Sequence, residues 1–170
     1  GKGGTGSAKC GGNYASSLLP QQQAMANGCA QVLFLDSQEG RYIEELGGMN
    51  VFLVQRDGSV ITPELSGSIL EGITRLSVIQ LLRDRGVSVT ERRIDVQEWI
   101  DGMRSGDIVE TFACGTAASI SPIGVLKGTD FSVGNADAEP GELTMSIRKE
   151  LTDIQYGRSE DRHGWLTKLV

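Results

Sequence analysis

The sequence predicts a single α/β domain of the mixed (α+β) type, with a mixed sheet flanked by helices. Apolar runs typical of strands alternate unevenly with segments typical of helices, and hairpin signals such as Asp57-Gly58 lie between some of the strands. That order favours a mixed sheet over a doubly wound parallel one. A chain of 170 residues fits one domain, and a domain near this size buries roughly 70% of the surface that its unfolded chain exposes.

The first half of the chain predicts one helix followed by four short strands. Residues 15–27 are expected to form the helix, which Asn27-Gly28 ends, and Pro20 predicts either a kink or a helix that begins beside it. The apolar run 32–35 is typical of a buried strand. The expected strands are residues 32–35, 42–46 and 51–55 and the run from Val60, with turns at Gly47-Gly48 and Asp57-Gly58.

The second half predicts three helices among further strands. After a Ser- and Gly-rich segment, residues 75–86 predict an amphipathic helix in which Leu76, Ile79 and Leu82 recur at helical spacing. The other expected elements are a strand at 87–94, a helix at 96–103, a strand at 108–114, apolar segments around Ile120, Pro122 and Val125, a polar loop at 128–140 and a helix at 142–156.

Composition limits the partners and the compartment. The net charge of −6, with acidic and basic residues interspersed, argues against nucleic-acid and anionic-membrane partners. Cys10, Cys29 and Cys114 are too few for a disulfide scaffold and lack metal-ligand spacing, which indicates a reduced, cytoplasmic protein without a metal site. No apolar run approaches the roughly 20 residues that span a bilayer. Because the first residues already belong to a motif, we expect an N-terminal portion to lie outside this sequence.

That opening motif, residues 3–14, surrounds Lys9 with glycines and follows it with Tyr14. A phosphate-binding loop of the ATPase type is excluded, because Ser7 stands where the lysine is required and no apolar strand precedes the loop. Glycines also let a backbone pass close to a flat cofactor, so Lys9 is a candidate Schiff-base lysine. From the stretch alone, a solvated loop charge is equally plausible.

Several segments in order and spacing resemble the class IV pyridoxal-phosphate aminotransferases, most closely the branched-chain enzymes. The segments are Lys9-Cys-Gly-Gly-Asn-Tyr14, Glu45-Leu-Gly-Gly-Met-Asn50-Val-Phe52, Val60-Ile-Thr62, Leu70-Glu-Gly-Ile-Thr-Arg75 and Phe112-Ala-Cys-Gly-Thr-Ala117. The likeness covers essentially the whole chain. It implies the larger, C-terminal domain of the class IV fold over residues 1–170, with the small N-terminal domain absent from this sequence.

The resemblance implies a role for three residues around the cofactor ring. Lys9 would carry pyridoxal 5'-phosphate and move a proton as general acid and base, and Tyr14 would donate a hydrogen bond to the ring hydroxyl oxygen. Glu45 would pair with the ring nitrogen, where an anion keeps the nitrogen protonated and the ring electron-withdrawing. Without the resemblance, a glutamate at a strand end is more often a surface charge.

The resemblance also implies a phosphate site and a carboxylate site. Ile73 and Thr74 lie at the start of an expected helix, where free N–H groups form an anion site, although a threonine there is more commonly an N-cap. Thr116, in a turn after a strand, would add a hydroxyl to the phosphate. Backbone at Gly48 and Ala117 would bind the substrate carboxylate.

The implied reaction is transamination of leucine, isoleucine and valine with 2-oxoglutarate, in branched-chain amino acid biosynthesis, by a homodimer. The alternatives are a D-amino-acid transaminase, aminodeoxychorismate lyase, and a folded but inactive domain fragment. Ala118 and Ser121 occupy the positions of a Cys-x-x-Cys pair found in some branched-chain enzymes, so no thiol switch is expected there. Arg92-Arg93, on an expected edge strand, and His163, in the tail, are expected to have no role in the site.

Overall fold

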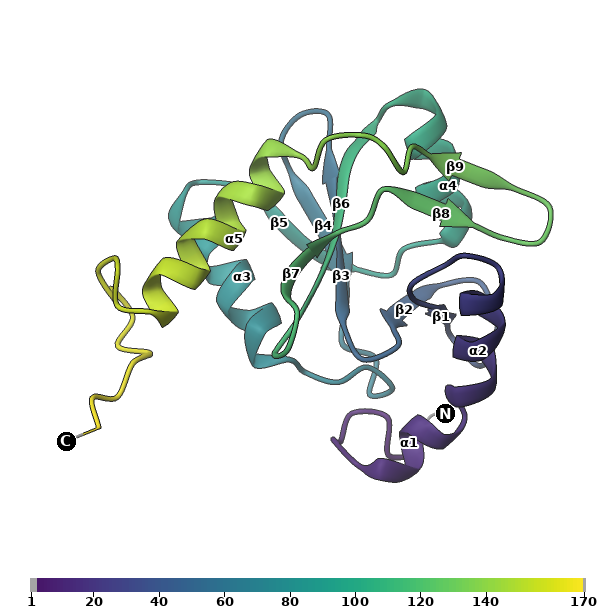
Figure 1. Cartoon of the computed structure of the whole chain (residues 1–170), viewed down its shortest axis with the longest axis horizontal. Helices are drawn as coiled ribbons and strands as arrows, with labels where there is room; N and C mark the ends of the chain where they lie inside the picture. The colour runs from purple at the N-terminus through teal and green to yellow at the C-terminus, as the bar shows by residue number, and fades with distance from the viewer. Residues whose placement is uncertain (1–2, 170) are drawn as a thin grey trace.

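The computed structural model describes residues 3–169, which form a five-stranded mixed sheet between two layers (Figure 1). The strand order is β5-β4-β3-β6-β7, and every neighbouring pair is antiparallel except β4 and β5, which are parallel. The strands are β3 (Asn50–Gln55), β4 (Val60–Pro63), β5 (Val89–Arg92), β6 (Ile108–Gly115) and β7 (Ser119–Pro122). The predicted mixed sheet is therefore confirmed.

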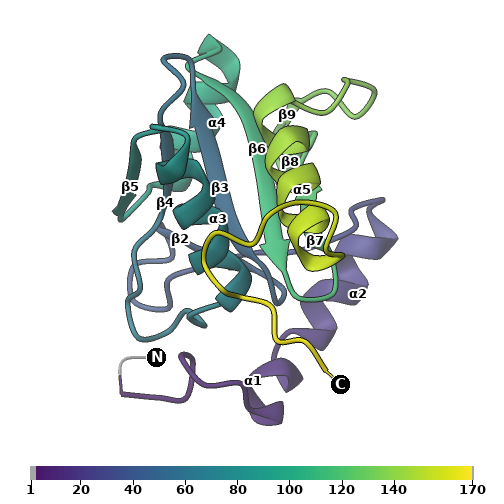
Figure 2. The same cartoon turned by 90° about the vertical axis from the view of Figure 1, so that its left-hand side faces the viewer.

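Two helices cover one face of this sheet (Figure 2). Helix α3 (Ile73–Asp84) and helix α5 (Glu142–Gln155) pack against Phe52 and Val54, which point to the same face because side chains alternate along a strand. The Phe52 ring stacks on that of Phe112 in the neighbouring strand, with 4.9 Å between the ring centroids. This layer is the larger core of the domain.

The opposite face is covered by helix α4 (Val96–Ser105) and by a separate two-stranded sheet of β1 (Leu33–Leu35) and β2 (Ile43–Leu46). The alternate residues of β3, Val51 and Leu53, contact this second core together with the fully buried Trp99 of α4. A short hairpin of β8 (Val125–Lys127) and β9 (Ser132–Gly134) completes the fold.

The expected helix at 15–27 corresponds to α2 (Leu18–Ala26), and a separate short helix, α1 (Gly11–Ala15), precedes it. Pro20 lies in the first turn of α2, where the N–H that proline lacks would have no intrahelical partner. Of the two alternatives for Pro20, the helix that begins beside it is correct. Neither helix contains a buried residue.

Two expectations from the pattern were wrong in detail. Helix α3 begins at Ile73 instead of Arg75, and its buried face includes Val78 and Leu81 while Leu76 is 42% exposed. The loop expected over 128–140 contains β9, whose Val133 is buried and which pairs with β8. A three-residue strand in a polar segment has too little periodicity to be recognised.

Within residues 3–169, no helix combines the length and the apolar character needed to cross a membrane.

Candidate active site

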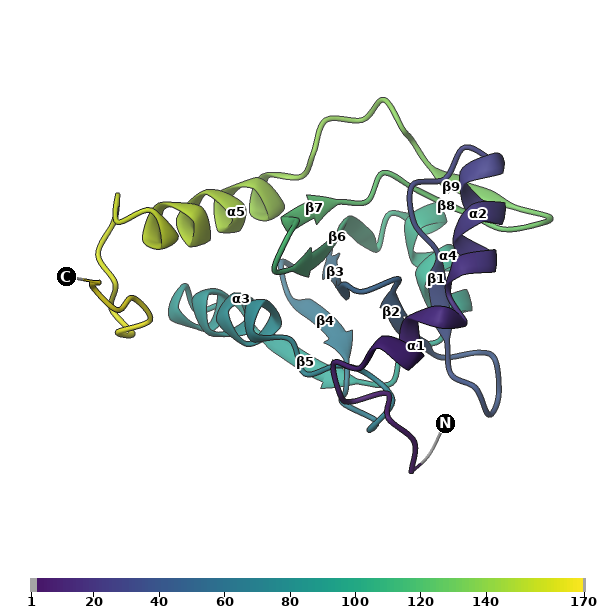
Figure 3. The same cartoon turned by 60° about the horizontal axis from the view of Figure 1, so that its bottom comes forward.

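The sequence-predicted site residues gather at one end of the sheet. In Figure 1 the β2–β3 turn, the β6–β7 turn and the start of α3 all lie along the lower side of the molecule, and α1 lies beneath them. Figure 3 views the domain from that side, with α1 and the loop before it in front of β2. Segments far apart in the sequence therefore converge where Lys9 and Glu45 are located.

The Lys9 loop, residues 3–9, is held by the side chain of Asn13. The Asn13 amide donates to the carbonyls of Thr5 and Ala8 over 2.8 and 2.9 Å, and its oxygen accepts from the Thr5 hydroxyl over 2.6 Å. Lys9 itself is exposed, and its Nζ lies 4.7 Å from the centroid of the Tyr14 ring. The structure therefore places two predicted residues, Lys9 and Tyr14, in direct contact.

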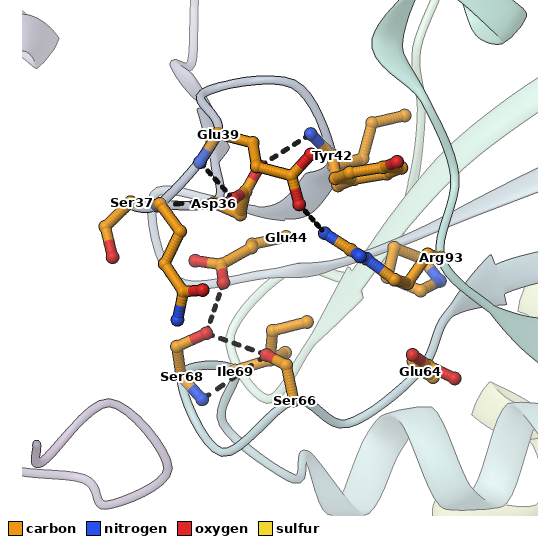
Figure 4. Close-up of a pocket in the computed structure, with 13 residues that line it drawn as sticks. Asp36, Ser37, Glu39, Tyr42, Glu44, Glu64, Ser66, Ser68, Ile69 and Arg93 are labelled. Atoms are coloured by element: carbon orange, nitrogen blue, oxygen red, sulfur yellow. Dashed lines mark hydrogen bonds and ion pairs between the residues drawn. The ribbon is translucent and has the colours of Figure 1, made fainter. Parts of the chain in front are cut away.

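The Lys9 loop also packs on the segment between β4 and α3. A Cβ on Gly6 would lie 2.5 Å from the carbonyl oxygen of Ser68, which is closer than any side chain tolerates. The Ser68 hydroxyl in turn donates to the carboxylate of Glu44, as Figure 4 shows. Through this chain of contacts the loop is fixed beside strand β2, which carries Glu45.

Glu45 lies half-buried in β2, and its electrostatics connect it to Lys9. Burial, followed by the neighbouring charge of Glu44, raises the pKa of Glu45 to about 7. The Leu70 backbone and the Lys9 ammonium act in the opposite direction and lower it. The Lys9 charge therefore acts on the Glu45 carboxylate through space, as the smallest of these four effects.

The start of α3 offers unused backbone donors. Its N-cap residue is Gly72, and no side chain caps the helix there. Asn50 fixes this turn: its amide donates to the Leu70 carbonyl over 3.1 Å, and a Cβ on Gly72 would lie 2.4 Å from its side-chain oxygen. The side chain of Ile73 is 75% exposed, so Ile73 can contribute to a site only through its backbone. The turn thus has the uncapped backbone N–H groups that an anion site needs.

The two turns expected to hold a carboxylate lie against each other. A Cβ on Gly115 would lie 3.4 Å from the carbonyl oxygen of Gly48. Gly48 has a φ of 123°, which only glycine adopts readily, and its N–H bonds to the Leu46 carbonyl within the turn. Thr116 and Ala117 follow in an exposed turn. A carboxylate at Gly48 would therefore compete with the bond to Leu46, whereas Ala117 is open.

The residues present fit pyridoxal phosphate. One end of the sheet combines an exposed primary amine, a phenol beside it, a half-buried carboxylate and a helix N-terminus without a side-chain cap. These groups match an aldehyde, a ring hydroxyl, a basic ring nitrogen and a phosphate respectively. The fit concerns the chemical types of these groups, which the fold brings to one end of the sheet.

A hollow of about 330 Å³ lies next to this cluster, on the Glu44 side of β2 (Figure 4). Its lining contains several carboxylates and the guanidinium of Arg93, which pairs with Glu39 over 2.8 Å. None of the sequence-predicted site residues lines it. A second groove, of about 580 Å³, runs between α3 and α5 beneath the tail, and of the predicted residues only Ile73 lines it.

Three residues in contact with the predicted site had no role assigned from the sequence: Asn13, Asn50 and Ser68. Asn13 and Asn50 lie inside two of the five segments that carry the resemblance, so their positions could have been noticed. Ser68 lies in an irregular segment that gave no signal. The side chain of each forms a hydrogen bond with a residue elsewhere in the chain. Asn13 bonds to Ala8, Asn50 to Leu70 and Ser68 to Glu44.

Arg92, Arg93 and His163 lie apart from the cluster of predicted site residues. Arg92 pairs with Glu98, and Arg93 lies over the Tyr42 ring, 3.5 Å from its centroid, beside the edge strand β5. His163 packs on Trp165 and bonds to the Asp84 carboxylate over 2.6 Å, at the α3–α5 groove.

Comparison with known proteins adds family information. A protein-family model described as amino-transferase class IV matches residues 6–125. The branched-chain-amino-acid aminotransferase of Mycolicibacterium smegmatis is 54% identical over 170 residues, covering 98% of this chain and 46% of its own length. This chain thus spans about half the length of the curated relatives it matches.

Solved structures of branched-chain amino acid aminotransferases are also similar to this chain. The branched-chain amino acid aminotransferase from Escherichia coli superposes with a TM-score of 0.80 at 34% identity, over 96% of this chain and 51% of its own. Another branched-chain amino acid aminotransferase, complexed with N-(5'-phosphopyridoxyl)-L-glutamate, has a TM-score of 0.79 at 34% identity, over 95% of this chain and 50% of its own. The enzyme from the archaeon Thermoproteus uzoniensis, solved with norvaline, has a TM-score of 0.79 at 33% identity, over 95% of this chain and 49% of its own.

Proposed function

The chain belongs to the class IV aminotransferases, whose family model spans residues 6–125, and on that premise we propose that it is the cofactor-binding domain of a branched-chain aminotransferase. The substrates are leucine, isoleucine and valine, the acceptor is 2-oxoglutarate, and the cofactor is pyridoxal 5'-phosphate. The names of the relatives favour this reaction over D-amino-acid transamination and aminodeoxychorismate cleavage. The phosphopyridoxyl-glutamate conjugate bound to one of them supports both the cofactor and a glutamate-derived acceptor.

One observation carries the proposal: the loop before Lys9 packs on Ser68, whose hydroxyl bonds to Glu44, the neighbour of Glu45 in β2. A reaction at the α-carbon of an amino acid needs an amine base on one side of the cofactor and an anion at the ring nitrogen. Pyridoxal phosphate, when bound, supplies an aldehyde that takes up the amino group and a ring that withdraws electrons from the substrate.

Lys9 has two functions in this proposal. Its amine would hold the cofactor, and Nζ would move the proton of the substrate α-carbon as general acid and base. The loop is exposed and glycine-rich, so the amine has room to leave and to return.

Tyr14 and Glu45 adjust the cofactor electronically. The Tyr14 hydroxyl donates a hydrogen bond to the ring hydroxyl oxygen. Glu45, with a pKa of about 7, would pair with the ring nitrogen, and a positive ring nitrogen would favour the ionised carboxylate.

The remaining groups bind the charged ends of the ligands. Backbone N–H groups of Ile73 and Thr74, with the hydroxyls of Thr74 and Thr116, bind the phosphate at the start of α3. Backbone of Ala117, whose turn is open, would bind the substrate carboxylate, and Gly48 would contribute only by giving up its N–H bond to the Leu46 carbonyl.

The test of the cofactor site is to locate the covalent bond. The chain is incubated with pyridoxal 5'-phosphate, reduced with borohydride and analysed by peptide mass spectrometry. We expect the added mass at Lys9. The control is Lys127→Ala, which lacks the amine that bonds to the Asn27 carbonyl, and labelling of Lys9 should be unchanged in it. In Lys9→Ala the added mass should disappear. A label spread evenly over the surface lysines would contradict the proposal.

Substrate choice is tested on the full-length protein by comparing kcat/KM for L-leucine, D-alanine and aminodeoxychorismate. Preference for either of the last two would overturn the branched-chain assignment. The homodimer, the cytoplasmic location and a small domain in the other half of the full-length protein stay predictions, and the first is tested by light scattering.

A further inference from the structure

We propose that Asn13 is the positioning residue for Lys9: it clamps the loop before the lysine so that the ammonium is held over the Tyr14 ring. The inference rests on the proposed function, because it concerns the same amine, but the clamp can be measured without turnover.

The Asn13 amide is fully used in this clamp. Its nitrogen donates both of its hydrogens, to the carbonyls of Thr5 and Ala8, and its oxygen accepts from the Thr5 hydroxyl. The Ala8 carbonyl belongs to the peptide group that joins Ala8 to Lys9. Fixing that carbonyl therefore fixes the orientation of the peptide group that precedes the Cα atom of Lys9.

The loop needs such a clamp because its own residues provide little packing. Residues 3–9 are exposed except for the half-buried Gly6, and glycine-rich backbone loses much conformational entropy when it is ordered. The contact of Gly6 with the Ser68 backbone fixes the loop at one point. The Asn13 side chain fixes it at two more, on either side of Gly6 along the chain.

Asn13 also links the loop rigidly to Tyr14. The two residues are consecutive in α1, and the Asn13 N–H bonds to the Cys10 carbonyl over 3.2 Å. A single short helix therefore holds both the loop that carries the amine and the ring under it. This explains how Nζ stays 4.7 Å from the ring centroid although Lys9 is exposed.

A merely structural asparagine is present nearby for comparison. The Asn27 side chain bonds to the Gln23 carbonyl over 2.8 Å at the end of α2, and within residues 3–169 it forms no hydrogen bond with the Lys9 loop. Asn13→Ala and Asn27→Ala thus each remove one side-chain amide, from α1 and from the end of α2 respectively. Only the amide of Asn13 bonds to the loop that carries Lys9.

The experiment measures two rates on the full chain: hydrogen exchange of residues 3–10 without cofactor, and attachment of pyridoxal 5'-phosphate to Lys9 by borohydride trapping. In Asn13→Ala we expect exchange to accelerate and attachment to slow by about tenfold each, since the variant lacks bonds that each contribute a factor of several. In Asn27→Ala both rates should stay within about twofold of the wild-type rates. Asn13→Asp, which keeps the shape but loses the donors, should behave like Asn13→Ala.

The proposal is overturned if Asn13→Ala retains both wild-type rates, or if its exchange rises equally in β3 and β6, which would indicate general destabilisation. If the wild-type chain does not attach the cofactor at Lys9, the proposed function fails, and the exchange rates still decide whether Asn13 clamps the loop.

Discussion

The ammonium of Lys9 lies over the ring of Tyr14, with 4.7 Å between Nζ and the ring centroid. Tyr14 can therefore contribute to the site in two ways. Its ring face lies under the amine, and its hydroxyl lies at the ring edge. A cation over an exposed aromatic ring is worth about 0.5–1 kcal/mol, so the ring alone holds the amine only loosely.

Replacing Tyr14 tests both contributions. Tyr14→Phe should still attach the cofactor to Lys9, but kcat of the full-length enzyme should fall by roughly 10- to 100-fold, since a hydrogen bond to a charged group is lost. Tyr14→Leu, which also lacks the ring face, should slow attachment as well. A phenylalanine variant that turns over at the wild-type rate would show that the hydroxyl has no role.

Gly6→Ala should displace the Lys9 loop. The new Cβ would lie 2.5 Å from the Ser68 carbonyl oxygen, which is backbone and cannot rotate away. Attachment of cofactor at Lys9 should fall by about tenfold or more, because a small misplacement of a catalytic group is costly. The matched variant is Gly12→Ala, where a Cβ meets nothing within 4 Å. Equal rates in the two variants would contradict the packing of the loop on Ser68.

The pKa of Glu45 predicts a pH-dependent stability. Its folded pKa of about 7 lies above the ordinary value of 4.5, so the folded state binds this proton more tightly than the unfolded state does. The stabilisation is complete below pH 4.5 and is lost as the pH rises through about 7. The free energy of unfolding of Glu45→Gln, taken relative to that of the wild-type protein, should therefore increase as the pH rises. The increase at pH 8 should be about 1 kcal/mol after allowance for solvent screening. Urea unfolding of both proteins from pH 4 to pH 8 measures the difference, and a constant difference would refute the prediction.

Glu110 should be important for stability through helix α5. Its carboxylate accepts the N–H groups of Leu143 and Thr144 over 3.0 and 2.8 Å, and the Thr144 hydroxyl over 2.7 Å. It therefore caps α5 from strand β6, in place of Gly141, whose own Cβ would collide with it. Glu110→Ala should lower the free energy of unfolding by about 2 kcal/mol. Glu139→Gln, an exposed change just before the helix, should alter it by less than about 0.5 kcal/mol in the same urea titration.

The thiols should react in an order set by their surroundings. A hydrogen bond from Thr5 and backbone bonds lower the pKa of Cys10, whereas burial raises the pKa of Cys114 to about 12. Because the thiolate is the reactive form, iodoacetamide at pH 8 should alkylate Cys10 early and Cys114 only when the chain unfolds. Thr5→Val should slow the reaction of Cys10. Mass spectrometry of timed samples gives the order, and early labelling of Cys114 would contradict its burial.

The strands and the amphipathic helices could be predicted because they bury side chains at regular spacing. The run Val51–Phe52–Leu53–Val54 is buried on both faces of the sheet and therefore apolar throughout, which the sequence displays directly. The start of α3 and the strand β9 were missed because their boundaries depend on partners elsewhere. Asn50 fixes the Gly72 turn from strand β3, and β9 forms by pairing with β8.

The sequence by itself determined the mixed fold, the residues of the family motifs and the identity of the candidate amine, because these depend on local pattern and on chemical type. Only the tertiary structure decided that the Lys9 loop packs on Ser68, that Asn13 holds the loop before the lysine, and that the turns at Gly48 and Gly115 touch. Those relationships join segments that lie apart along the chain. They depend on packing and on charges acting through space, which no periodicity along the chain records.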